Sequence, residues 1–166
     1  MHLARRDTLS GLGNRSALEQ AMATEAARAQ RFGLPFTLLM VDIDHFKRVN
    51  DSLGHSAGDE VIRSVAGELA ACLRPYDQAF RFGGEEFVVL LGQTGIGKGM
   101  EIAERIRRRI AARCRPDVDP ANRITVSLGV ASFDPTQTLG QLFDRADKAL
   151  YRAKETGRNR SVAARD

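Results

Sequence analysis

Apolar residues recur at intervals of three and four along much of the chain, a spacing that predicts amphipathic helices. Four such stripes lie within residues 18–29, 61–73, 102–110 and 142–153. A capping-box pattern at Ser16 predicts the start of the first helix, and Thr138 is expected to open the last one. Gly33 and Gly157 are expected to end these two helices.

Nearly continuous apolar runs predict strands that are buried in a sheet. Two such runs lie at residues 36–43 and 124–133. Shorter runs at 79–80 and 87–91 flank two glycines and predict a hairpin, and a short edge strand is expected near 161–163. This order indicates an α+β fold of the ferredoxin-like or polymerase-palm kind, a sandwich whose central, mostly antiparallel sheet is flanked by helices.

The composition is that of a globular domain with one core. The 166 residues are 43% hydrophobic and 28% charged, so residues 1–166 are expected to form a single domain, with 1–6 left over from an upstream linker or a tag. No apolar run reaches the roughly 20 residues that span a bilayer, and no membrane contact is expected. Cys72 and Cys114 stand far apart, which favours reduced core thiols and a cytoplasmic location. Membrane anchoring of a longer parent protein stays open.

The formal charge of +4 points only weakly to an anionic ligand. Much of the excess lies in one segment, at Arg105, Arg107, Arg108, Arg109, Arg113 and Arg115. Such a run is typical of a solvated helix face. Because no aromatic residues are interleaved with it to stack on bases, no nucleic-acid partner is expected.

Residues 81–87 (RFGGEEF) place two adjacent carboxylates, Glu85 and Glu86, on a double-glycine turn. Tandem glycines permit positive φ angles and close backbone approach. The two carboxylates repel each other unless a cation lies between them, and Mg²⁺ prefers carboxylate oxygens. The turn is therefore either a metal site or a solvated hairpin tip.

A second acidic pair, Asp42 and Asp44, lies at the end of the apolar run 36–43. Alternation along a strand places both side chains on one side and Ile43 on the other. An acidic strand end beside an acid-tipped hairpin has the geometry of a two-metal phosphoryl-transfer site. Alone, these aspartates would be expected to cap the next turn.

Residues 46–59 are polar and spaced by glycines, and they predict a loop that runs into the second helix. Asn50 and Asp59 can offer an amide and a carboxylate to a purine edge, and Lys47 can meet a phosphate. Each residue also has a structural alternative. Asn50 suits a β-turn, Asp59 suits a first helical turn, and His55 suits a structural hydrogen bond.

Several ordered motifs resemble the GGDEF domain of diguanylate cyclases. They are residues 7–15 (DTLSGLGNR), 42–47 (DIDHFK), 50–51 (ND), 54–55 (GH), 58–59 (GD), 81–87 (RFGGEEF), 147–154 (DKALYRAK) and 157–159 (GRN). The resemblance covers about residues 7–159. Ser10 stands where the family's opening motif has Thr, which affects only the expected geometry of the opening turn.

The resemblance implies that two GTP molecules, one on each protomer of an antiparallel homodimer, condense to cyclic di-GMP and release pyrophosphate. It implies two Mg²⁺ ions per active site, with Mn²⁺ as the alternative, and an upstream sensory or dimerising domain. The implied metal ligands are Asp42, the Ile43 carbonyl, Glu85 and Glu86. Glu85, as the base for the attacking hydroxyl, and Glu86 are the implied catalytic residues. The implied GTP-binding residues are Phe46, Lys47, Asn50, His55, Asp59, Gly83, Gly84, Lys154 and Arg158.

Residues 74–77 (RPYD) resemble the family's RxxD motif of product inhibition, at the expected offset from Gly83. The resemblance implies that Arg74 and Asp77, assisted by Arg105 of a neighbouring domain, bind cyclic di-GMP. Arginine suits this role because it contacts phosphate bidentately and stacks on guanine. The alternative is an arginine at a helix end that pairs with Asp77.

Two other functions fit parts of the sequence. Residues 92–98 (GQTGIGK) spell most of a P-loop, but Gly99 stands where Mg²⁺ needs Ser or Thr, and the preceding strand is expected in a hairpin. A P-loop NTPase is therefore a remote alternative. A catalytically silent GGDEF module that binds GTP or cyclic di-GMP is the nearer one. Such modules usually have a degraded acidic turn or lack the residue at Asp42, and neither change is present.

Overall fold

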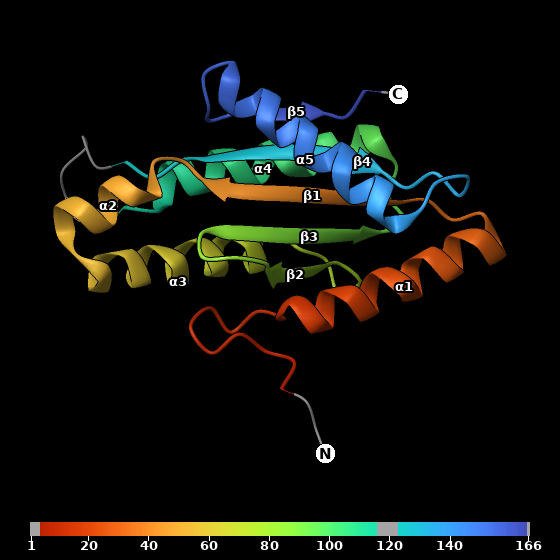
Figure 1. The fold of residues 1–166 in the computed structure, drawn as a ribbon, viewed down its shortest axis with the longest axis horizontal. Coiled ribbons are helices and arrows are strands. Elements are labelled where there is room, and N and C mark those ends of the chain that lie inside the picture. The colour runs from red at the N-terminus through yellow and green to blue at the C-terminus, as the bar shows by residue number, and fades with distance from the viewer. Residues whose placement is uncertain (1–3, 116–122, 166) are drawn as a thin grey trace.

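A five-stranded sheet with helices on both faces forms the centre of the molecule (Figure 1). The computed structural model describes residues 4–115 and 123–165. The strands are β1 (Phe36–Ile43), β2 (Gln78–Arg81), β3 (Glu86–Gly92), β4 (Val126–Ser132) and β5 (Ser161–Ala163). The helices are α1 (Arg15–Phe32), α2 (Phe46–Leu53), α3 (His55–Ala71), α4 (Ile96–Arg113) and α5 (Leu139–Glu155).

The strand order is β2-β3-β1-β4-β5, with β1 at the centre. β1 pairs antiparallel with both β3 and β4, and β2 pairs antiparallel with β3. Only the β4–β5 pair among these is parallel. The predicted α+β architecture with a mostly antiparallel sheet is confirmed.

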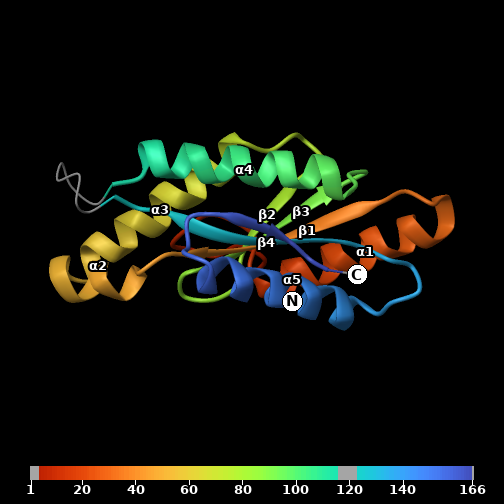
Figure 2. The same ribbon diagram turned by 90° about the horizontal axis from the view of Figure 1, so that it is seen from above.

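Every residue of β1 is buried, because helices cover the sheet on both sides. Leu39, Val41 and Ile43 belong to a core cluster shared with α3 and α4. Leu38 and Met40 face the opposite way, into a cluster shared with α1 and α5. Figure 2 shows α3 and α4 on one side of the sheet and α1 and α5 on the other. The central strand thus ends between two helical layers, and its last residues emerge at the edge of the core.

Helix α5 packs very closely against β4, at Gly129. A Cβ added there would collide with Ala146 O and Leu150 N and lie 3.0 Å from Leu150 Cα. Glycine is therefore required by the close approach of two backbones. This contact fixes how α5 crosses the sheet and hence where its last turn lies.

The segment after β1 is a helix, and the predicted loop at residues 46–59 is wrong. α2 follows His45 directly and is separated from α3 only by Gly54, whose φ is 88°. Val49 is the one buried residue of α2. Because one buried position gives no repeating stripe, the polar sequence resembles a loop. Asn50 therefore lies in a helix, and the β-turn alternative is wrong.

The predicted ends of α1 and α5 are partly right and partly wrong. α1 begins at Arg15, and its N-cap is Asn14, whose side chain accepts a bond from Ala17 N; the capping box expected at Ser16 is not formed. Gly33 ends α1 with a φ of 69°. Thr138 caps α5 in a full capping box with Gln141, as predicted.

The arginine run on α4 is only partly a solvated face. Arg107 donates to Glu104 and Arg109 pairs with Glu68 of α3, while Arg108 is largely exposed. The P-loop hypothesis also loses its structural basis, because β3 is antiparallel to both neighbours and Lys98 pairs with Glu101 at 3.1 Å. Within the described ranges, no helix is long and apolar enough to cross a membrane.

Candidate active site

The double-glycine turn connects β2 to β3 and is held by its own backbone and by one arginine. Phe82 N and Gly83 N donate to Glu86 O at 2.8 and 3.2 Å. Arg81 donates to Gly84 O at 2.8 Å and pairs with Asp7 at 3.3 Å. The opening motif of the chain is thereby attached to the acidic turn, a contact that the sequence analysis did not foresee.

Gly83 lies close to the end of the flexible Glu86 side chain, and its backbone is not left-handed. A Cβ at Gly83 would lie 2.9 Å from Glu86 Oε2, whereas a Cβ at Gly84 would meet nothing within 4 Å. Neither residue has a positive φ, so that part of the expectation is wrong. Because Gly83 has no side chain, the Glu86 carboxylate can lie close to the turn.

Strand register brings the predicted acidic residues together. Asp42 on β1 lies directly opposite Glu86 on β3. One step further along, Ile43 N donates to Glu85 O at 3.2 Å. Because these partners come from adjacent antiparallel strands, their side chains are close neighbours. The residues predicted as metal ligands therefore converge at one end of the sheet.

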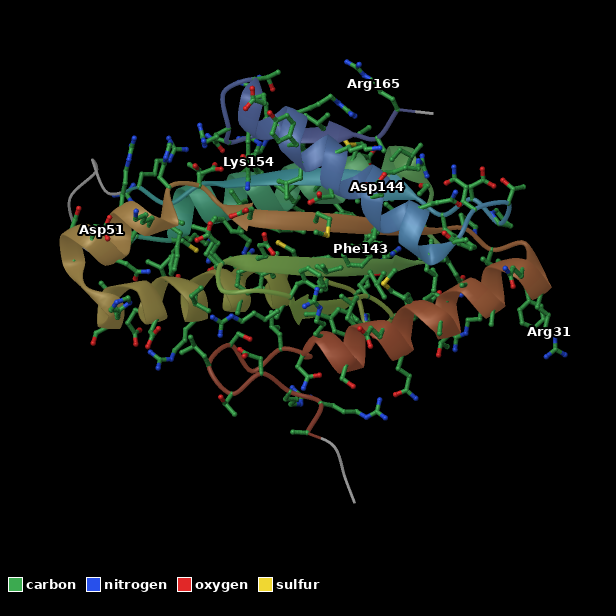
Figure 3. The ribbon with its side chains drawn as sticks, viewed as in Figure 1. Arg31, Asp51, Phe143, Asp144, Lys154 and Arg165 are labelled. Carbon is green, nitrogen blue, oxygen red and sulfur yellow. The ribbon has the colours of Figure 1, made fainter. Side chains whose placement is uncertain are left out.

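Lys154, in the last turn of α5, brings a positive charge to these acidic residues. Asp42 is 3% exposed, and its Oδ2 accepts a hydrogen bond from Lys154 Nζ. Figure 3 shows the Lys154 side chain extending from α5 toward the end of β1. The other oxygen, Asp42 Oδ1, is buried and has no hydrogen-bond partner among the described residues. An unpaired buried carboxylate oxygen is costly, and it indicates a place for a further donor or a cation.

The two glutamates titrate unusually because of this crowding. Burial, followed by the charge of Asp42 and a hydrogen bond with it, raises the pKa of Glu85 to about 7. Burial and Asp42 also raise the pKa of Glu86, against the opposing effect of Lys154. Lys154 is the cation bonded to this group, and the charge of Arg15 also acts on Glu86. The group has too little positive charge, as expected of a site that takes a cation.

The donor set suits a hard divalent ion that is shared with a ligand. Among residues 4–115 and 123–165, no three His, Cys, Asp or Glu side chains are arranged to hold a metal by themselves. Mg²⁺ is typically held by one or two carboxylates together with substrate phosphates and water. Asp42 and the glutamates fit that mode of binding.

The predicted guanine-reading residues lie on α2 and at the start of α3. A Cβ at Gly58 would collide with Asn50 Oδ1 and lie 3.2 Å from Phe46 Cζ, so these three residues are in close contact. Lys47, His55 and Asp59 are exposed. The structure brings Phe46 and Asn50 together, while the remaining three side chains stand at the surface of the same helix pair.

Arg158 lies in the turn after α5, close to the start of α2. Burial, then the positive charges of Arg48 and Arg158, lower the pKa of His45, the residue that precedes α2. Arg158 and Lys154 therefore both lie near the end of β1. Two cations at an acidic strand end can serve a polyanion whose phosphates also bind a metal.

The RxxD residues form an internal ion pair. Arg74 Nε and Nη2 donate to Asp77 at 2.9 and 3.0 Å, and Nη2 also reaches Thr94 Oγ1 at 2.7 Å. This is the structural alternative named from sequence. Arg105 donates to Cys72 O at 2.7 Å and lines a surface cavity of about 840 Å³ together with Arg108, Arg109 and Arg113.

Comparison with known proteins identifies the family. The model of the family "Diguanylate cyclase, GGDEF domain" matches residues 4–160. The chain belongs to the GGDEF domain family. It is 47% identical to diguanylate cyclase DgcP of Pseudomonas aeruginosa over 158 residues, which is 95% of this chain and 24% of DgcP. The chain spans a quarter to two fifths of the length of the curated relatives it matches.

Solved structures show that this GGDEF domain shares the family fold. The GGDEF domain of DgcB from Caulobacter crescentus, in complex with c-di-GMP, has a TM-score of 0.91 and 36% identity, covering 98% of this chain and 97% of that one. The active GGEEF domain of a diguanylate cyclase from Vibrio cholerae has a TM-score of 0.87 and 35% identity, covering 93% and 99%.

Proposed function

We propose that this GGDEF domain is the catalytic part of a diguanylate cyclase, which joins two GTP molecules into cyclic di-GMP and releases two pyrophosphates. The observation that carries the proposal is the convergence of Asp42, Glu85 and Glu86 at the end of β1, where Asp42 Oδ1 is buried and has no hydrogen-bond partner in the described part of the chain. The names of the relatives support the same activity.

The acidic group would hold Mg²⁺, with Mn²⁺ as the alternative. Asp42, the Ile43 carbonyl, Glu85 and Glu86 are the ligands we assign. The metal would neutralise phosphate charge and acidify the attacking 3′-hydroxyl. We assign to Glu85 the role of base for that hydroxyl, with Glu86 adding negative charge to the metal site.

The remaining residues would bind and orient GTP. Lys154, Arg158 and Lys47 supply positive charge for the triphosphate, which reaches the backbone of the small Gly83–Gly84 turn. Asn50 and Asp59 offer acceptors to the guanine N1–H and its amine. Phe46 and His55 would border the base. Binding of this kind performs most of the catalysis, because phosphoryl transfer depends on positioning and charge neutralisation.

A single copy of this site would be only half of the reaction centre. Each protomer would present one GTP, so an antiparallel homodimer would bring the 3′-hydroxyl of one GTP to the α-phosphate of the other. An upstream sensory or dimerising region would regulate that encounter. The share of each relative that this chain spans supports the presence of further domains in such proteins.

Cyclic di-GMP would also act as an inhibitor at the RxxD residues. The cavity beside Arg105 lies on α4, and Arg105 reaches the carbonyl of Cys72, close to Arg74. The hydrogen bonds from Arg74 to Asp77 and Thr94 use its Nε and Nη2 atoms and none uses Nη1. A phosphate of cyclic di-GMP would therefore meet an Arg74 side chain whose orientation these bonds already set.

Turnover of GTP distinguishes this enzyme from a silent module that only binds nucleotide. Concentrated protein, and the same protein fused to a dimeric coiled coil, should convert GTP to cyclic di-GMP and pyrophosphate in the presence of Mg²⁺, measured by nucleotide chromatography. Glu86→Gln should abolish product. Glu101→Gln is the matched control, because Glu101 lies exposed on α4 and forms its ion pair with Lys98. Absence of product from the fused dimer would refute the enzyme proposal.

A further inference from the structure

The turn that carries Arg158 has an unusual backbone. Gly157, Arg158 and Asn159 have consecutive positive φ angles of 127°, 62° and 45°. Glycine adopts such angles freely, but for arginine they are uncommon and must be held by the surroundings. Gly157 N and Arg158 N donate to Lys154 O and Ala153 O, the two bonds of a Schellman motif that ends α5. These bonds leave the N–H of Asn159 to find an acceptor elsewhere.

Asn159 is held from two sides by residues distant in sequence. Its N–H donates to Asp44 Oδ2 at 3.0 Å, and its Oδ1 accepts from Arg107 Nη1 at 3.0 Å. Asp44 is thus linked across 115 positions to the turn after α5. The bond from Asn159 N to Asp44 comes one residue after Arg158. It therefore restrains the backbone that follows Arg158, whereas the Schellman motif restrains the backbone that precedes it.

Asp44 is fully occupied by this structural role. It is 7% exposed, its Oδ1 accepts from Ser127 Oγ at 2.7 Å, and its Oδ2 accepts from Thr125 Oγ1 at 2.7 Å. Asp42 differs, since one of its oxygens has no partner among the described residues. The two aspartates of the DID segment therefore have different surroundings: both oxygens of Asp44 accept hydrogen bonds, whereas Asp42 keeps one oxygen for a further donor or a cation.

We propose that Asp44 is a positioning residue for the substrate: by accepting the N–H of Asn159, it holds the Arg158 turn in the left-handed conformation that presents the guanidinium to the triphosphate. This inference rests on the proposed function, because Arg158 is assigned to GTP there. Asp44 acts through Arg158, without touching metal or nucleotide.

Nucleotide binding without turnover tests the proposal. Affinity for a non-hydrolysable GTP analogue should fall about tenfold in Asp44→Ala, the size of one charged contact, and by a similar factor in Arg158→Ala. The double variant should lose no more than Arg158→Ala alone. In the coiled-coil dimer, Asp44→Ala should raise KM and change kcat less than about twofold.

Two matched variants separate positioning from general loss of structure. Asp44→Asn should retain near-normal affinity, because its amide can donate to Ser127 Oγ while its oxygen still accepts from Asn159 N. Thr125→Val removes one donor to Asp44 and leaves the Asn159 bond. It should lower the melting temperature and leave nucleotide affinity within about twofold. GMP has fewer phosphates than the GTP analogue. Its affinity should therefore differ less between wild type and Asp44→Ala than the affinity of the GTP analogue does.

Hydrogen exchange can be measured on the wild-type protein, so this test does not require any variant to fold. The Asn159 amide should exchange slowly, together with the amides of β4. A fast-exchanging Asn159 amide, or additive losses in the double variant, would overturn the positioning role. If Arg158→Ala itself leaves affinity unchanged, the assignment of Arg158 under the proposed function fails instead.

Discussion

At the residue scale, the candidate site depends on carboxylates that are close together and short of positive charge. Motif resemblance was sufficient to select Asp42, Glu85, Glu86 and Lys154, and the structure brings these four side chains together. Their detailed roles remain predictions. The partners of Asp44 could not be predicted, because Ser127 and Asn159 are distant in sequence and only the fold brings them together.

The raised pKa of Glu85 predicts a pH-dependent stability. Folding raises this pKa from 4.5 to about 7, so the folded state favours the protonated carboxyl. That contribution is fully present below about pH 4.5 and is lost as the pH rises through about 7. In EDTA, the melting temperature of wild type relative to Glu85→Gln should therefore decrease between pH 5 and pH 8. A difference that stays constant over that range would contradict the prediction.

Addition of Mg²⁺ supplies the control for the same measurement. The ion should raise the melting temperature of wild type more at pH 8 than at pH 5, because it binds the ionised carboxylates. Glu85→Gln should respond less at both pH values.

The Arg74–Asp77 pair predicts a loss of stability that experiments on product inhibition must take into account. The Asp77 side chain is 1% exposed, and Arg74 is its ion-pair partner. Arg74→Ala would leave a buried carboxylate unpaired and should lower the free energy of unfolding by about 2 kcal/mol in urea titrations. Adding Asp77→Asn should restore part of this loss. Two strictly additive losses would show that the pair is not coupled.

At the scale of the elements, the long buried runs were predicted well and the short polar ones were not. β1 and β3 follow their apolar runs closely, because burial on both faces leaves few polar residues in them. α2 was missed since Val49 is its one buried residue. The true N-cap of α1, Asn14, and the expected one, Ser16, are both cap-forming residues, and only tertiary contacts choose between them.

Contact between α5 and β4 predicts a large effect for a small substitution. Gly129→Ala would force a methyl group into the α5 backbone and should lower the free energy of unfolding by about 2–3 kcal/mol. Since α5 carries Lys154, affinity for the GTP analogue should fall as well. The control is Gly67→Ala at an exposed position of α3, where an added Cβ meets nothing within 4 Å. That change should stabilise the protein by up to about 1 kcal/mol. Equal urea midpoints for the two variants would refute the close approach.

At the scale of the whole molecule, the sequence predicted the layers of the fold but did not specify the parallel pairing of β5 with β4. A three-residue strand has too few positions to indicate its partner. The last turn of α5 and the segment before β5 contain Lys154, Arg158 and Asn159. The short edge strand therefore helps to anchor the part of the chain that supplies the cations of the site.

The half-site arrangement predicts how the rate depends on protein concentration. If two protomers must meet, doubling the concentration of the unfused domain, far below its dimerisation constant, should raise the rate about fourfold. The coiled-coil fusion should show a rate proportional to concentration, because its protomers are already paired. A dilution series at saturating GTP, with sedimentation to establish the oligomeric state, measures both. A specific activity that is constant over a tenfold dilution of a monomeric sample would show that one copy of the acidic turn suffices. The dimer requirement would then be wrong, while the metal site at Asp42, Glu85 and Glu86 would stand.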